Sequence, residues 1–228
     1  MKNKNQVQDT SNWENIPLLY NEFFNALLTG DRLKCRKIAL GLLENKFPVK
    51  NLYEDILKQS LYEIGDLWEN GEISVATEHL ASAIVENILN DVYAQIVSEK
   101  HINKSVVVTC VENEFHQIGV KMVADIFEMN YWKVHFLGAN IPVKDLIDFI
   151  EKKQPNLLAV SMSLYFHLPL LENILKRVNA EFPHLTILIG GQGMRHGGLD
   201  VLARYSNTIY VSDLTYLENF IRKGHANG

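Results

Sequence analysis

Two patterns of apolar residues divide the chain near residue 100. From Ile16 to Val97 the apolar residues recur every three or four positions, as they do along one face of a helix. This spacing predicts four helices, which cover residues 18–28, 31–45, 49–67 and 74 to about 92. Four helices with short connections are typical of a four-helix bundle. We therefore expect a helical-bundle domain over residues 13–98.

The ends of these helices carry local signals in the sequence. Gly30 follows the first helix, Pro48 follows the second, and Ser74 has the side chain of an N-cap for the fourth. The periodicity also predicts which side chains of the second helix face the core. We expect these to be Leu33, Ile38, Leu42 and Leu43.

After the polar segment Ser98–Lys104, short β-branched runs alternate with amphipathic helices. The predicted strands are 105–111, 133–137, 157–161, 186–189 and 208–211. The predicted helices are 118–129, 143–152, 168–181, 199–204 and 214–222. Apolar runs such as VVVTCV and TILIG indicate strands buried on both faces, which is typical of a parallel sheet covered by helices. We therefore expect an α/β fold, with a five-stranded Rossmann-like (flavodoxin-like) domain over residues 103–228.

Within this second domain, four bulky residues are expected to belong to the core. They are Met122, Phe127, Met129 and Phe136. Ligands of open parallel sheets bind at the carboxyl ends of the strands. The strand ends are therefore where functional residues should lie.

Composition narrows the class of protein further. The chain is 47% hydrophobic, and no run approaches the 18 to 20 apolar residues of a membrane span. The first twelve residues are polar and lack the apolar stretch of a signal peptide. Only two cysteines occur, and the net charge is −5, which does not favour a disulfide framework or a nucleic-acid surface. We expect a cytoplasmic protein that binds neither membranes nor nucleic acid directly.

The first strand ends in a loop that holds a carboxylate and an imidazole two positions apart, Glu114 and His116. Such a pair suits a metal or a proton-transfer role, although a loop histidine can also be an ordinary solvated residue. The third strand ends in Ser161 and Ser163, and the fourth ends in the glycine-rich segment 190–193. These glycines either form a turn or allow a bulky ligand to approach the sheet edge closely.

The second domain resembles the cobalamin (vitamin B12) binding domain, whose usual motifs are D-x-H-x-x-G, S-x-L and G-G. Here the first motif reads Glu114-x-His116-x-x-Gly119, and 41 residues separate it from Ser161-x-Ser163. After a further 26 residues comes the glycine pair. Glutamate replaces the usual aspartate and keeps the carboxylate, while Ser163 replaces the leucine.

The resemblance implies that cobalamin binds with its own base displaced from cobalt and with His116 as the lower axial ligand. Glu114 would then hold the other ring nitrogen, which fixes the tautomer of the imidazole. Ser161 would make a further polar contact. The cofactor-binding residues that the resemblance implies in this domain are Glu114, Phe115, His116, Gln117, Ile118, Gly119, Ser161, Ser163, Gly190, Gly191, Gln192 and Gly193.

The predicted bundle carries a second motif, a tryptophan followed after nine residues by Glu-His. Trp68, Glu78 and His79 resemble the signature of adenosylcobalamin-dependent light-sensing transcription regulators. In that family the tryptophan packs over the adenosyl group and the Glu-His pair contacts it, with Val75 as a packing neighbour here. The alternative is that Trp68 is a core residue and that Glu78 only stabilises the first turn of its helix.

Two departures from that family are visible. About fifteen residues precede the bundle, so no DNA-binding helix-turn-helix domain is expected in this sequence. Light-sensing members usually have a histidine directly after the tryptophan, where this chain has Glu69. A stable photoproduct with two histidine ligands is therefore not expected.

The sequence thus supports one leading hypothesis and two alternatives. The leading hypothesis is a cobalamin-binding sensor of light that binds adenosylcobalamin and acts through homo-oligomerisation or a protein regulator. The main alternative is a corrinoid subunit that carries a methyl group, as methylcobalamin, for methyltransferase partners. The third is a storage or delivery module. We expect no self-contained enzyme and no catalytic residue.

Overall fold

The computed structural model describes residues 15–225. The polar segment 1–12 and the expected start of the bundle domain at residue 13 lie outside this range. The chain divides into two compact units, with the boundary between Ile88 and Leu89. This boundary falls within the long helix α5 (Val75–Ile96). We describe the two units separately.

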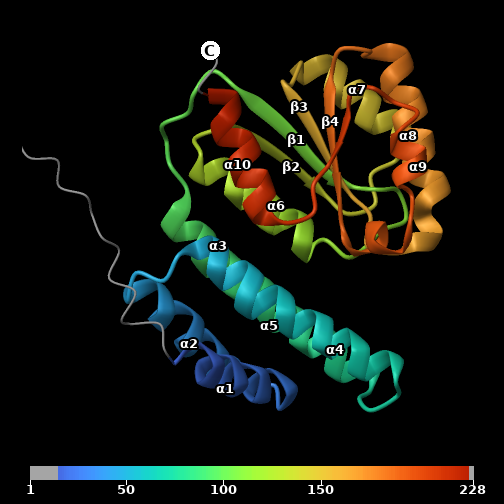
Figure 1. Cartoon of the computed structure of the whole chain (residues 1–228). Coiled ribbons are helices and arrows are strands. Elements are labelled where there is room, and N and C mark those ends of the chain that lie inside the picture. The colour runs from blue at the N-terminus through green and yellow to red at the C-terminus, as the bar shows by residue number, and fades with distance from the viewer. Residues whose placement is uncertain (1–14, 226–228) are drawn as a thin grey trace, which may run out of the picture. The chain divides into compact units, whose positions relative to one another are not determined.

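Unit 1 is helical, as the periodicity predicts (Figure 1). Its elements before α5 are α1 (Ile16–Leu28), α2 (Arg32–Glu44), α3 (Val49–Asn51), the π-helix η2 (Leu52–Lys58) and α4 (Gln59–Glu69). The last three are continuous in sequence and correspond to the predicted third helix. The π-helical stretch within it was not predicted, because the spacing of apolar residues does not report which hydrogen-bond ladder a helix adopts.

The buried face of α2 differs from the prediction at one position. Leu33 was expected to face inward, but it is 82% exposed. Leu42 is buried as predicted, and Cys35 and Ala39, which were not predicted, are buried with it. These three share one helix face because they are four and three residues apart, whereas Leu33 lies on nearly the opposite side of the helix from Cys35.

Unit 2 contains a five-stranded parallel sheet in the order β2-β1-β3-β4-β5. The strands are β1 (Ser105–Cys110), β2 (Lys133–Gly138), β3 (Leu157–Ser161), β4 (Thr186–Gly190) and β5 (Thr208–Tyr210). The helices are α6 (Ile118–Met129), α7 (Val143–Lys153), α8 (Leu168–Glu181), α9 (Leu199–Leu202) and α10 (Leu214–His225). This strand order is that of flavodoxin-like folds, so the predicted fold class is confirmed.

Helices cover both faces of the sheet. In Figure 1, α6 and α10 lie on one face, and α7, α8 and α9 lie on the other. β3 is buried along its whole length, as its uninterrupted apolar sequence predicts. The side chains of Val107, Leu158 and Ile187 meet those of α7 and α8 in one core cluster.

The predictions for bulky core residues hold only in part. Met122 and Phe127 are buried, as expected, and Met129 is half-buried. Phe136 was expected in the core but is 40% exposed. It lies on β2, the edge strand, which has a neighbouring strand on one side only and is less covered than the central strands.

Two short 3₁₀ helices that the sequence did not predict follow β3 and β4. They are η3 (Tyr165–His167) and η4 (Gln192–His196). Both lie at the carboxyl edge of the sheet, where the predicted ligand site should be. No helix among the described residues is long and apolar enough to cross a membrane.

Candidate functional site

The three predicted motifs of unit 2 begin side by side at one edge of the sheet. Cys110, the last residue of β1, is in register with Ser161, and Ser161 is in register with Gly190. All three strands run in the same direction, so the loops that follow them emerge at the same edge. Segments far apart in the sequence are thereby placed together, as the strand-end rule predicts.

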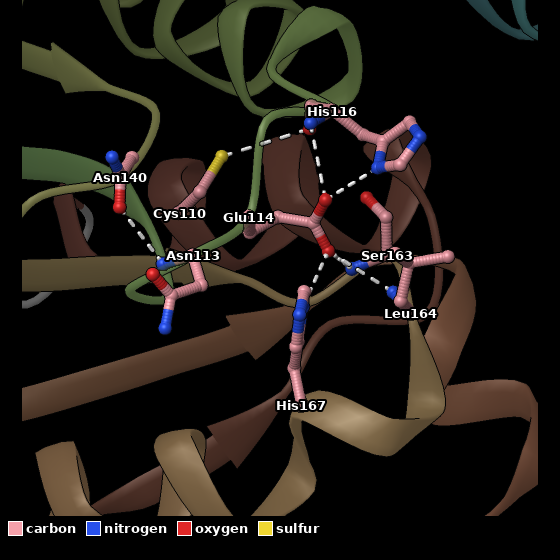
Figure 2. A network of polar contacts seen from close by, with 8 residues as sticks. All are labelled: Cys110, Asn113, Glu114, His116, Asn140, Ser163, Leu164 and His167. Atoms are coloured by element: carbon pink, nitrogen blue, oxygen red, sulfur yellow. Dashed lines mark hydrogen bonds and ion pairs between the residues drawn. The ribbon is translucent and has the colours of Figure 1, made fainter.

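Glu114 is the centre of a polar network at this edge (Figure 2). Its side chain is fully buried. Oε1 accepts a hydrogen bond from the backbone N–H of His116, at 3.1 Å, and also pairs with Nδ1 of the His116 ring. Oε2 accepts from the backbone N–H groups of Ser163 and Leu164, both at 3.1 Å, and lies 3.2 Å from Nδ1 of His167. Five donors from two loops therefore converge on one buried carboxylate.

These contacts decide the charge of Glu114. Burial alone would raise the pKa of the carboxyl, because it penalises the charged form. The hydrogen bonds and positive potential from His116, together with the backbone N–H of Leu164, outweigh burial and lower the pKa of Glu114 to about 2. Glu114 is therefore ionised at neutral pH and can only accept hydrogen bonds.

The ionised carboxylate in turn decides which nitrogen of His116 carries the proton. Since Glu114 can only accept, Nδ1 of His116 must be the donor in their contact. In the neutral imidazole this leaves the lone pair on Nε2. The His116 side chain is 58% exposed, so this nitrogen belongs to a side chain that an external ligand can approach. A histidine held by a carboxylate in this way is typical of metal ligands and is not expected of an ordinary surface residue.

His167 is a member of the network that the sequence analysis missed. Its backbone N–H donates to the carbonyl of Leu164, at 3.0 Å, and its ring reaches Glu114. Ser161 was expected to make a further polar contact, but it is not among the donors to Glu114, and Ser163 contributes its backbone N–H. Its position four residues after Ser163, in the same strand-end loop, did not by itself indicate a contact with Glu114.

The glycines after β4 have a structural reason within the protein. Gly191 has φ +103°, and a Cβ atom there would lie 2.3 Å from the carbonyl oxygen of Met162. Gly193 donates a backbone hydrogen bond to that same oxygen, at 3.0 Å. The glycine-rich segment therefore packs directly on the loop after β3, which holds the N–H groups of Ser163 and Leu164 in place for Glu114. This supports the turn interpretation of these glycines.

Gly119 is different, because nothing in the described protein requires a glycine there. A Cβ atom on Gly119 would have no other atom within 4 Å. The residue lies in the first turn of α6, where glycine weakens a helix relative to alanine. Of its neighbours in the motif, Phe115 is exposed, and Gln117 and Ile118 are half-buried. The surface beside His116 is thus open to a close-lying ligand.

In unit 1 the second predicted motif lies around the end of α4 and the start of α5. Trp68 is 46% exposed and Val75 is also exposed, so the interpretation of Trp68 as a core residue is wrong. Ser74 accepts a hydrogen bond from the backbone N–H of Thr77, at 3.2 Å, which confirms it as the N-cap. An exposed indole beside a capped helix start is a surface suited to contact with a flat ligand.

Glu78 and His79 form a polar pair in the first turns of α5. Oε1 of Glu78 accepts a hydrogen bond from the hydroxyl of Ser82, at 2.9 Å, and Oε2 pairs with Nδ1 of His79. The His79 side chain is mostly exposed. This pair presents hydrogen-bonding groups on the same face of α5 as Val75, which lies three residues before Glu78.

Two family models match the chain. Residues 104–211 match a model described as a B12 binding domain, and residues 19–91 match a second model with the same description. The chain is a cobalamin-binding protein of the B12-binding-domain family. The B12-binding domains thus include both the Glu114 network and the Trp68 motif.

Named relatives carry the same domains in different proteins. The chain is 26% identical over 154 residues to the HTH-type transcriptional repressor CarH of Myxococcus xanthus, covering 65% of this chain and 49% of that protein. It is 24% identical over 134 residues to trimethylamine corrinoid protein 1 of Methanosarcina mazei, covering 58% of this chain and 62% of that protein. The chain thus spans about half to three fifths of the length of these curated relatives.

A solved structure agrees on the fold. The monomethylamine corrinoid protein of Methanosarcina barkeri matches with a TM-score of 0.79 and 14% sequence identity, over 91% of this chain and 99% of that chain. At this identity the likeness shows the fold alone.

The residues of unit 2 fit cobalamin. A neutral imidazole from the protein would suit cobalt as a ligand. His116 is such an imidazole, with Nδ1 held by Glu114. The open space at Gly119 lies three residues further along the same loop and helix start.

Proposed function

We propose that this cobalamin-binding protein is a regulatory sensor that binds adenosylcobalamin with the nucleotide base displaced and with His116 as the lower axial ligand. The observation that carries the assignment of His116 as the ligand is the fully buried Glu114, which is bonded to Nδ1 of His116. This arrangement keeps the Nε2 lone pair available and raises its basicity. We propose no catalytic residue for this chain.

The other proposed contacts in unit 2 surround His116 at the sheet edge. They are Phe115, Gln117, Ile118, Gly119, Ser161, Ser163, Gly190, Gly191, Gln192 and Gly193. The assignment is better supported at exposed positions such as Phe115 and Gln192, which a ligand can reach, than at buried positions such as Ser161 and Gly193. Gly191 acts mainly through the loop contact that it permits with Met162.

In unit 1, Trp68, Val75, Glu78 and His79 are proposed to contact the adenosyl group. An indole offers a flat apolar surface to an adenine ring, and a carboxylate and an imidazole suit ribose hydroxyls. The exposure of Trp68 and Val75 supports this role, because side chains needed only for the core of unit 1 would be buried. The similarity to a CarH repressor over 154 residues supports it as well.

Adenosylcobalamin supplies a cobalt–carbon bond that light can break. Loss of the adenosyl group would then leave Trp68 and Val75 without their proposed packing partner. Such a change can alter self-association or the binding of a protein regulator. Glu69, which follows Trp68, is a poorer cobalt ligand than histidine, so we expect no stable product with two histidine ligands.

The test is an absorbance spectrum of the protein with adenosylcobalamin before and after green light, with size-exclusion chromatography of both samples. We expect a spectral change and a changed elution volume. His116→Ala is the control and should lose the bound cofactor. Unchanged spectra and elution of a loaded protein would remove the light-sensing role and leave cobalamin binding intact.

A second candidate, a methyl-carrying corrinoid subunit, is supported by the similarity to trimethylamine corrinoid protein 1. The same lower ligand would serve a carrier. To separate the two functions, the reduced cobalamin complex is mixed with a methyl donor and purified methyltransferases. Formation of methylcobalamin at a rate that depends on the methyltransferase favours the carrier, and its absence together with a light response favours the sensor.

A further inference from the structure

His167 is a buried histidine that none of the motifs above includes. Only 6% of its surface is exposed, and it is the last residue of η3, directly before α8. Its ring Nδ1 lies 3.2 Å from Oε2 of Glu114 (Figure 2). Its ring and the ring of Phe166 form an edge-to-face contact with centroids 4.3 Å apart. Backbone and ring contacts therefore hold His167 toward the carboxylate.

The direction of the His167–Glu114 hydrogen bond follows from the other donors around the carboxylate. Backbone N–H groups, which can only donate, already point at both oxygens, so Glu114 is an acceptor on both sides and Nδ1 of His167 is the donor. Two imidazoles therefore donate to the same carboxylate, His116 to Oε1 and His167 to Oε2. They lie on separate loops, after β1 and after β3.

This sharing restricts the rotation of the carboxylate. If the Glu114 carboxylate turned, Oε1 would leave the ring of His116 and Oε2 would leave His167. The backbone N–H groups of Ser163 and Leu164 also hold Oε2, but they belong to the same loop as His167. The hydrogen bond from His167 comes from a side chain, whereas those from Ser163 and Leu164 come from the backbone. A substitution at His167 can therefore remove its donor without changing the backbone.

We propose that His167 is a positioning residue for His116: its hydrogen bond to Oε2 of Glu114 fixes the carboxylate that holds the His116 ring in the Nδ1–H form, with Nε2 directed to the ligand. The part of this inference that concerns cobalt rests on the proposed function of His116. The part that concerns the tautomer of His116 does not need cobalamin at all.

A matched pair of variants separates hydrogen bonding from packing. In His167→Asn the side-chain amide places an N–H close to the position of the ring Nδ1. In His167→Leu a side chain of similar shape has no donor. His184, an exposed histidine that precedes β4, provides the control variant His184→Leu.

The first measurement uses the cobalamin-free protein. In ¹⁵N-labelled wild type, NMR should show both His116 and His167 protonated at Nδ1. In His167→Leu we expect His116 to become a mixture of tautomers, whereas His167→Asn and His184→Leu keep the wild-type form. A wild-type His167 without a proton on Nδ1 overturns the proposal, even if the leucine variant does not fold.

The second measurement is the affinity for hydroxocobalamin. With ¹⁵N-labelled protein, a two-line nitrogen splitting in the electron paramagnetic resonance spectrum of the reduced cob(II)alamin complex identifies the His116 bond, because the unlabelled base of cobalamin gives three lines. Removing one outer partner of a metal ligand typically weakens binding ten- to a hundred-fold. We expect about tenfold for His167→Leu, because two backbone donors remain on Oε2. His167→Asn should stay within about threefold of wild type.

The outcomes test the proposed cobalt ligand, His116, separately from the proposed role of His167. If His116→Ala binds as tightly as wild type, the proposed cobalt ligand is wrong, and the tautomer measurement still tests His167. If His116→Ala abolishes binding while His167→Leu behaves as wild type in both measurements, the inference on His167 is overturned and the proposed function stands. Equal weakening in the leucine and asparagine variants also overturns it, because packing alone would then explain the loss.

Discussion

Each unit of the protein contains a glutamate paired with a histidine one or two residues later, and the two pairs differ in burial. In unit 2, Glu114 is fully buried and accepts five hydrogen bonds. In unit 1, Glu78 is partly exposed, and its hydrogen bonds come from the side chains of Ser82 and His79. A buried charge is costly unless its hydrogen bonds are made, whereas an exposed ion pair contributes little.

This difference indicates which of the two pairs is held in place in the cobalamin-free protein. The carboxylate of Glu114 stays in place because the fold supplies its partners from the loops after β1 and β3. Glu78 and His79 can change rotamers at little cost, because water replaces any hydrogen bond that they lose. Unit 2 thus holds its histidine, His116, in a fixed position, and unit 1 presents an adaptable surface. The following experiments test this contrast, in order of decreasing expected effect.

The largest effect is expected from Gly191→Ala. The backbone at Gly191 has positive φ, and the added Cβ would lie 2.3 Å from the carbonyl oxygen of Met162, so the loop that holds Glu114 must shift. We expect a loss of about 3 kcal/mol in the free energy of unfolding, measured by urea denaturation. The control is Gly119→Ala, where the Cβ has open space.

Gly119→Ala should leave the cobalamin-free protein as stable as wild type, or more stable by about 0.5 kcal/mol, because alanine favours a helix. Its effect should instead be a weaker affinity for cobalamin. Equal stability of the Gly191→Ala variant and wild type would show that the glycine loop does not support the Glu114 site.

Acid should weaken the fold through Glu114. The pKa of Glu114 in the folded protein is about 2, against an ordinary value of 4.5, so its stabilising contribution is complete above about pH 4.5. That contribution is lost as the pH falls from about 4.5 to about 2, and the shift corresponds to about 3 kcal/mol. Urea denaturation at several pH values should show this decline in wild type.

Glu114→Gln provides the comparison for the acid experiment. It should be less stable than wild type at neutral pH, because an amide N–H would face donors that now point at a carboxylate oxygen. Its stability should also decline less between pH 4.5 and pH 3, because the buried carboxylate is gone. Parallel pH profiles for the two proteins would contradict the assignment of Glu114 as the buried charge.

Trp68→Ala should affect ligand binding and leave the fold almost intact. The indole is about half exposed, so unit 1 loses little packing. We expect the affinity for adenosylcobalamin to fall about tenfold, or ~1.4 kcal/mol, and the affinity for hydroxocobalamin to stay the same. Leu33→Ala, at an exposed apolar position of α2, should change neither. An equal loss for both cobalamins would mean that Trp68 does not contact the adenosyl group.

The smallest effect is expected at Ser74. This residue caps α5 through the backbone N–H of Thr77, and its replacement by alanine should cost about 1 kcal/mol in the free energy of unfolding. Ser74→Asn keeps a capping side chain and should remain close to wild type. A similar loss in both variants would assign the effect to something other than the cap.

Site residues that belong to a sequence motif could be identified from the sequence. Site residues that contact the motif from a distant segment of the chain could not. The resemblance to the cobalamin-binding domain implied the pairing of Glu114 with His116, and the structure confirms this contact. His167 was missed because its contact with Glu114 spans 53 positions in the sequence and depends on β1 and β3 being neighbours. Leu33 and Phe136 were assigned wrongly because apolar character alone does not tell which side of an element is covered.

The sequence by itself determined the order of helices and strands, the parallel sheet and the strand ends at which the candidate site residues lie, because these depend on periodicity and on short motifs. Only the tertiary structure decided that one carboxylate is buried among five donors, that the histidine beside it keeps its proton on Nδ1, and that the glycines after β4 serve a contact between two loops. Burial and hydrogen bonding between distant segments are properties of the packed chain, and no local pattern of residues encodes them.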